Sequence, residues 1–138
     1  MEKILLWGAA AGLAHFVVIA LLYANPVVDA FSREANKHVS VKQWNPLWKY
    51  FVTQFLGTQV EVYIMTIAFF WIRPMTTAPG YLGAFEVGAL FAALRVYPRF
   101  WNMWIQTTFP NRLLLVEVIN GTLGCLFIAC FLQAMTQH

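Results

Sequence analysis

Four long apolar runs divide this chain, and shorter polar or turn-forming segments separate them. The runs cover residues 4–24, 50–72, 81–96 and 113–134. About 20 apolar residues are enough for one helix to cross the hydrocarbon core of a bilayer. The pattern therefore predicts a single domain, residues 1–138, that is an all-α, integral membrane, antiparallel four-helix bundle.

The two long connections carry patterns of their own. After Asn25-Pro26, apolar positions recur at helical spacing on one face and charged positions on the other, which is typical of a short helix lying in the membrane interface. The apolar positions are Val27, Val28, Phe31, Ala35 and Val39, and the charged ones are Asp29, Arg33, Glu34 and Lys37. Phe100, Trp101, Trp104 and Ile105 predict a second interfacial helix between Tyr97-Pro98 and Pro110.

Composition supports a membrane protein. Of the 138 residues, 60% are hydrophobic and 11% are charged, whereas an ordinary soluble domain has roughly 25% charged residues. The first run is long enough to span and ends in Tyr23-Ala24-Asn25-Pro26, so we expect a retained helix and not a cleaved signal peptide. Cys125 and Cys130 lie inside the last run, where we expect them to act as small apolar side chains.

The basic residues predict the orientation. Four spans place both long connections on one side, and these hold Arg33, Lys37, Lys42, Lys49, Arg99 and Arg112. The side of the termini holds Lys3 and Arg73. An excess of Lys and Arg marks the cytoplasmic face, so both termini are predicted on the non-cytoplasmic side of a membrane of the bacterial inner membrane type. Topology explains the positive charge, and no nucleic-acid partner is expected.

Ionisable residues inside the runs are the candidate functional residues. A charged side chain at the middle of a membrane helix costs roughly 2.5–3.5 kcal/mol on insertion scales, so each one needs a partner. Counting about 1.5 Å per residue places His15 and Glu61 near the midplane and Glu86 in the outer half. These three residues form the candidate intramembrane polar site. Arg95 and Glu117 reach similar depths and form a candidate structural ion pair.

Two interpretations of the polar site stay open. Polar side chains within a bundle often only bond neighbouring helices, but they also mark paths for protons or cations. The ligand types of His15, Glu61 and Glu86 would suit a metal ion, but neither His-x-x-x-His nor Glu-x-x-His spacing occurs, so no metal is predicted. The sequence shows no nucleophile–base pair and no cofactor motif, so no catalytic residue and no cofactor are predicted.

Two classes of function follow. The first is a small transport unit for protons or small solutes, assembled as a homo-oligomer in the lipid bilayer. The alternative is a non-catalytic accessory subunit that binds a lipid or a membrane partner protein, with residues 100–105 as the docking surface. A membrane-bound enzyme acting on a lipid is a third, weaker option.

Short motifs mark the boundaries of the runs. The first run ends in Leu22-Tyr23-Ala24-Asn25-Pro26, Pro46-Leu47-Trp48-Lys49-Tyr50 opens the second, Gly80-Tyr81-Leu82-Gly83 opens the third, and Asn111-Arg112 precedes the fourth, which carries Asn120. In this layout the chain resembles a family of small four-span bacterial membrane proteins, classed as a domain of unknown function. The resemblance implies a four-span fold and residence in a membrane, and it implies no activity.

Overall fold

The chain is all-helical in the computed structural model, which describes residues 2–35, 42 and 44–137. Within these residues there are five α-helices, one 3-10 turn and no strand. The elements are α1 (Glu2–Tyr23), α2 (Pro26–Ala35), α3 (Leu47–Ile72), η1 (Arg73–Met75), α4 (Gly80–Gln106) and α5 (Asn111–Thr136). The predicted all-α class is confirmed.

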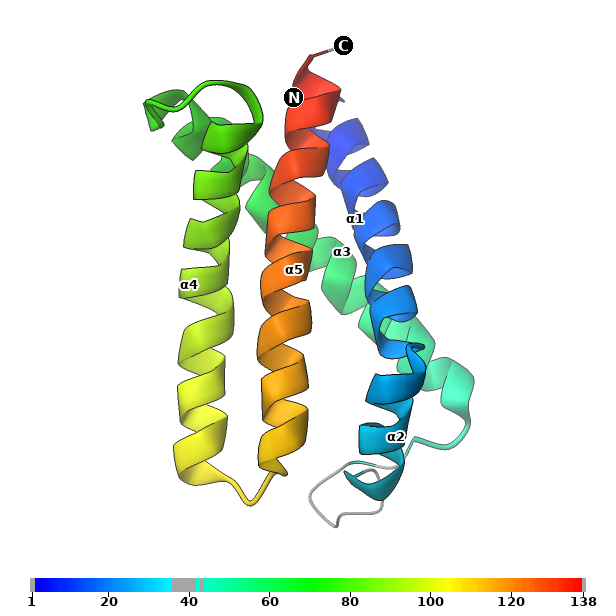
Figure 1. Ribbon diagram of the computed structural model, residues 1–138. Coiled ribbons are helices and arrows are strands. Elements are labelled where there is room, and N and C mark those ends of the chain that lie inside the picture. The colour runs from blue at the N-terminus through cyan, green and yellow to red at the C-terminus, as the bar shows by residue number, and fades with distance from the viewer. Residues whose placement is uncertain (1, 36–41, 43, 138) are drawn as a thin grey trace.

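The four long helices run alternately up and down. Figure 1 shows α5 between α1 and α4, with α3 crossing behind them at an angle. Packing is most extensive between α4 and α5, followed by α1 with α3 and α1 with α5, whereas α3 and α4 approach each other at few points. Both termini lie at one end of the molecule, and the α4–α5 connection lies at the opposite end (Figure 1).

Three helical stretches are long and apolar enough to cross a membrane, namely Glu2–Tyr23, Leu47–Met75 and Asn111–Thr136. Many of their exposed side chains are large and apolar, which is compatible with a lipid environment. Leu6 on α1 is 67% exposed and Ile64 on α3 is 64% exposed. The fourth long helix, α4, is not among these three stretches although it has 27 residues.

Small residues allow α4 and α5 to approach closely. Ala84, Gly88 and Ala92, spaced four apart on α4, were expected to form a helix-contact face, and all three are buried. A Cβ added at Gly88 would lie 2.9 Å from the Cα of Leu126, closer than real Cβ atoms come to a backbone atom. The expected contact face is confirmed, and its partner is α5.

The α1–α3 contact repeats once per turn. Gly8 lies against the ring of Tyr63, and Gly12 lies against the side-chain amide of Gln59. One turn further along α1, the rings of Phe16 and Phe55 meet edge to face, with 5.3 Å between their centroids. The two glycines of α1 thus make room for larger side chains of α3, and small residues of this kind allow helices to approach closely in membranes.

The two connections differ from each other. A helix follows Asn25-Pro26 as predicted and spans Pro26–Ala35, and Asn25 Oδ1 caps it by accepting a hydrogen bond of 2.9 Å from the Val27 N–H. The rest of that predicted helix, residues 36–39, lies outside the described residues.

The prediction of a separate second interfacial helix is wrong, because α4 continues through Pro98 to Gln106. Because proline has no backbone N–H, the helix lacks one hydrogen-bond donor at Pro98. Both Pro98 and Leu94, whose carbonyl loses its donor, lie on the exposed side of α4, away from α5. The loss therefore leaves the packed face intact. Residues 100–105, which include three aromatic side chains, form the last turns of α4.

Candidate functional site

The polar centre of the fold is an ion pair between α3 and α4. Arg95 Nε pairs with Glu61 Oε1, and Arg95 Nη2 donates to Glu61 Oε2, so the guanidinium and the carboxylate meet through two parallel contacts. Contacts of this two-pronged kind are the strong form of an Arg–carboxylate pair. The side chains remain 31% exposed for Arg95 and 35% for Glu61. This pair therefore bridges the two helices without being enclosed by them.

The same arginine reaches α5. Arg95 Nη1 donates to Cys125 Sγ over 3.6 Å, so one guanidinium links α3, α4 and α5. Cys125 was expected only to fill space, and it is indeed fully buried. Its additional contact with Arg95 could not be anticipated from its spacing in the sequence.

His15 is buried against an adjacent face of α5. Its side chain is 2% exposed and lies so close to Gly124 that a Cβ there would be 2.6 Å from His15 Cε1. His15 Nδ1 is buried and has no hydrogen-bond partner within the part of the chain that the structure describes. The next residue of α5, Cys125, contacts Arg95. The imidazole and the guanidinium therefore approach neighbouring residues of α5, and they are not hydrogen-bonded to each other.

The structure pairs Arg95 and Glu117 differently from the expectation. Arg95 joins Glu61, and Glu117 Oε1 instead accepts a 2.6 Å hydrogen bond from the Tyr23 hydroxyl at the end of α1. The apolar run 81–96 predicts that Arg95 lies near the end of its helix. Since α4 runs on to Gln106, Arg95 lies at mid-helix, level with Glu61 and not with Glu117.

Glu86 lies apart from this centre. It is exposed on α4, nine residues from Arg95, which on a helix is half a turn away in direction. The structure therefore brings Glu61 together with Arg95, places His15 against the neighbouring residue of α5, and leaves Glu86 on the outer face. Among the described residues, no group of three or more His, Cys, Asp or Glu side chains has the geometry to hold a metal ion.

A second polar centre lies at the end of the molecule that carries the termini, and the sequence reasoning missed it. Arg73 Nε donates to Gln133 Oε1 over 2.8 Å, Nη1 donates to Thr76 Oγ1 over 2.7 Å, and Nη2 donates to the Gly80 carbonyl over 2.9 Å. Gly83 leaves room for this guanidinium, since a Cβ there would lie 2.8 Å from Arg73 Cζ. The arginine fastens the turn between α3 and α4 to α5.

Four buried polar atoms lack a hydrogen-bond partner among the residues that the structure describes. They are His15 Nδ1, Gln59 Nε2, Asn120 Nδ2 and Thr122 Oγ1. Buried polar groups in folded proteins are nearly always hydrogen-bonded, so each unpaired one calls for an explanation. Asn120 was noted in the sequence only as part of a motif, and the structure places it 5% exposed on α5.

Comparison with known proteins gives no relative. The chain matches no protein-family model, no curated protein and no solved structure. The resemblance to a four-span bacterial family, based on short motifs, therefore stays a prediction.

Proposed function

We propose that this protein is a multi-pass membrane subunit in which α1, α3, α4 and α5 all cross the bilayer, and that it works in an assembly formed on the outer face of α4. At about 1.5 Å per residue, the 27 residues of α4 extend for roughly 40 Å, which is enough to span. Since α4 packs along α5, it would lie at the same depth as α5.

This proposal rests on charged side chains of α4 that no other helix of the same chain covers. Glu86 is exposed, and the Glu61–Arg95 pair is about one-third exposed, although both lie along the length of the long helices and not at their ends. Charged groups that face hydrocarbon are costly, so they normally face protein or water. A neighbouring subunit on α4 would remove this cost. A second copy of the chain is the partner to test first.

Cross-linking through introduced cysteines tests the assembly. In a Cys125→Ser, Cys130→Ala background, Ala89→Cys adds a thiol to the exposed side of α4, and Leu13→Cys adds a matched thiol to α1, where Leu13 is 56% exposed. We expect cross-linked dimers in the membrane from Ala89→Cys and none from Leu13→Cys. A cross-link to a different protein from Ala89→Cys would place that protein on the same face. A monomeric protein that forms no cross-link from either position would refute the assembly.

The proposed orientation places both termini on the non-cytoplasmic side. It is supported by Lys49, Arg99 and Arg112, which are exposed in the helix ends opposite the termini. At the terminal end, each of the three guanidinium nitrogens of Arg73 donates a hydrogen bond within the fold. A reporter that is active only outside the cytoplasm should work at either terminus. Activity of a cytoplasm-only reporter at both termini would reverse the topology.

A second candidate function, the handling of protons or small solutes, is favoured by the buried and unpaired His15 Nδ1 near the Glu61–Arg95 pair. Such a function would use titratable groups that meet neighbouring residues of α5. The purified protein in liposomes, with a pH-sensitive dye inside, provides the test. Glu61→Gln should abolish proton flux, and Glu2→Gln, at the exposed end of α1, should leave it unchanged. Absence of flux from the unmodified protein, or equal flux in Glu61→Gln, would exclude this function.

A further inference from the structure

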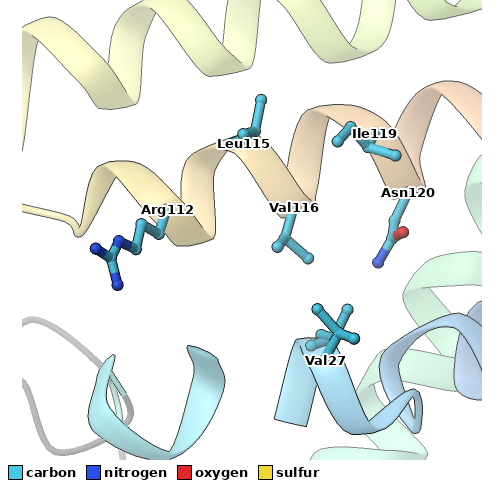
Figure 2. A pocket seen from close by; sticks show the side chains of 7 residues that line it. Val27, Arg112, Leu115, Val116, Ile119 and Asn120 are labelled. Atoms are coloured by element: carbon cyan, nitrogen blue, oxygen red, sulfur yellow. The ribbon is translucent and has the colours of Figure 1, made fainter. Parts of the chain in front are cut away.

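An apolar groove separates α2 from α5. It has a volume of about 510 Å³, and Figure 2 shows Val27 of α2 facing side chains of α5 across it. The lining residues are Val27, Val28, Arg112, Leu115, Val116, Ile119 and Asn120. The groove lies at the end of the bundle that carries the proposed cytoplasmic connections.

The inner end of this groove is polar and lacks a partner. Asn120 is 5% exposed, and its Nδ2 has no hydrogen-bond partner among residues 2–35, 42 and 44–137. Figure 2 shows its amide directed from α5 toward the side of Val27. An amide nitrogen is a donor with two N–H bonds. A ligand that satisfies it must therefore present an oxygen acceptor inside an otherwise apolar groove.

The outer end of the groove is cationic. Arg112 lies eight residues before Asn120 on α5, which is about 12 Å along the helix, and it lines the same groove. Arg112 already has an interaction of its own, but a guanidinium has five N–H donors and can serve two partners. Glu117, between the two on α5, is bound to Tyr23 of α1 and does not line the groove.

From outside to inside, the groove thus offers a cation, an apolar wall and a hydrogen-bond donor. A glycerophospholipid carries matching groups, with an anionic phosphate at the membrane surface, ester carbonyls deeper in, and acyl chains. We propose that the groove between α2 and α5 binds one acidic glycerophospholipid. The phosphate pairs with Arg112, an ester carbonyl accepts from Asn120 Nδ2, and an acyl chain lies against Val116 and Ile119.

We expect the headgroup of this lipid to carry net negative charge, because basic side chains gather at this end of the molecule. Lys49 and Arg112 are both exposed there. Anionic lipids are attracted to such basic segments next to the membrane. This site does not depend on the assembly proposed above, because it lies on α2 and α5 and not on the outer face of α4.

Lipid retention by the full-length protein tests the site. The protein is purified from vesicles that contain equal amounts of phosphatidylglycerol and phosphatidylcholine, and the retained lipid is counted by native mass spectrometry. We expect about one phosphatidylglycerol per chain. Val116→Trp fills the groove and should reduce retention about tenfold, and Arg112→Gln should reduce it several-fold. The matched controls, Leu123→Trp on the exposed side of α5 and Arg99→Gln, should retain the lipid.

Several results would overturn the proposal. Equal retention in Val116→Trp and Leu123→Trp would mean loosely held surrounding lipid, as would equal amounts of the two lipids. If Val116→Trp fails to fold, the comparison of Arg112→Gln with Arg99→Gln decides, and equal retention refutes the site. Displacement of the bound lipid by inorganic phosphate would show that the groove recognises the anion alone.

Discussion

Glu61 and Arg95 face each other at the middle of α3 and α4, and they join two helices that otherwise approach at few points. The pair is the main polar link of α3 to the α4–α5 unit at this level. Its stability depends on both charges, because removing one partner leaves the other uncompensated in a poorly solvated place. This relationship leads to the first prediction.

Glu61→Gln should destabilise the protein. Breaking a buried pair by removing one partner costs about 3–5 kcal/mol, whereas a fully exposed pair contributes about 1 kcal/mol or less. Since the two side chains are one-third exposed, we expect a loss of about 1–3 kcal/mol in the free energy of unfolding, measured by denaturant titration in detergent micelles.

The double variant Glu61→Gln, Arg95→Gln separates charge from packing. If the ion pair matters as a unit, the double variant should lose less than the sum of the two single variants. Additive losses would show that the two side chains act independently. Glu117→Gln is the control carboxylate, because its partner is Tyr23 and its substitution should not couple to Arg95.

The second prediction concerns the close contact of α4 with α5. Gly88→Ala should destabilise the protein by about 1–3 kcal/mol, because the new Cβ would lie 2.9 Å from the Leu126 Cα and would push the helices apart. Gly57→Ala is the matched control on α3, since a Cβ there meets nothing within 4 Å. Alanine is a better helix former than glycine, so the control should be neutral or stabilising by up to about 1 kcal/mol. Thermal unfolding of both variants checks the difference, and equal melting temperatures would contradict it.

The sequence predicted the helices well where their apolar pattern was strong. The runs 4–24, 50–72 and 113–134 correspond to α1, α3 and α5, because long apolar segments have few alternatives to a helix. The contact face at Gly88 was also predictable, since small residues four apart lie on one side of a helix.

The pairing of charges was less predictable. Pro98 suggested the end of a helix, yet the helix continues, and this moved Arg95 from the end of α4 to its middle. Rise per residue gives depth along a helix, but it gives no direction around the axis. The sequence therefore could not tell that Glu86 points away from Arg95, or that Asn120 lines a groove beside α2.

The third prediction concerns Arg73, which three hydrogen bonds join to Gln133, Thr76 and the Gly80 carbonyl. Arg73→Lys should not preserve these three hydrogen bonds, because a lysine lacks the planar guanidinium that reaches three acceptors in different directions. We expect faster cleavage of the turn between α3 and α4 in limited proteolysis. Lys3→Gln, a charge removed from the exposed start of α1, is the control and should leave the cleavage rate unchanged. A wild-type rate in Arg73→Lys would mean that charge alone is needed.

The last prediction concerns the link between the end of α1 and the start of α5. Tyr23→Phe removes the hydroxyl that donates to Glu117 Oε1 over 2.6 Å and leaves the ring in place. A hydrogen bond to a charged group contributes about 1.5–3 kcal/mol, so the free energy of unfolding should fall by about that amount. Tyr97→Phe is the matched control, because Tyr97 is 46% exposed on α4 and its hydroxyl does not bond Glu117. Glu117→Gln, combined with Tyr23→Phe, should restore part of the loss, since a neutral amide without the hydroxyl is less costly to leave unpaired than a carboxylate. A Tyr23→Phe variant as stable as Tyr97→Phe would show that water or lipid replaces the hydroxyl without loss.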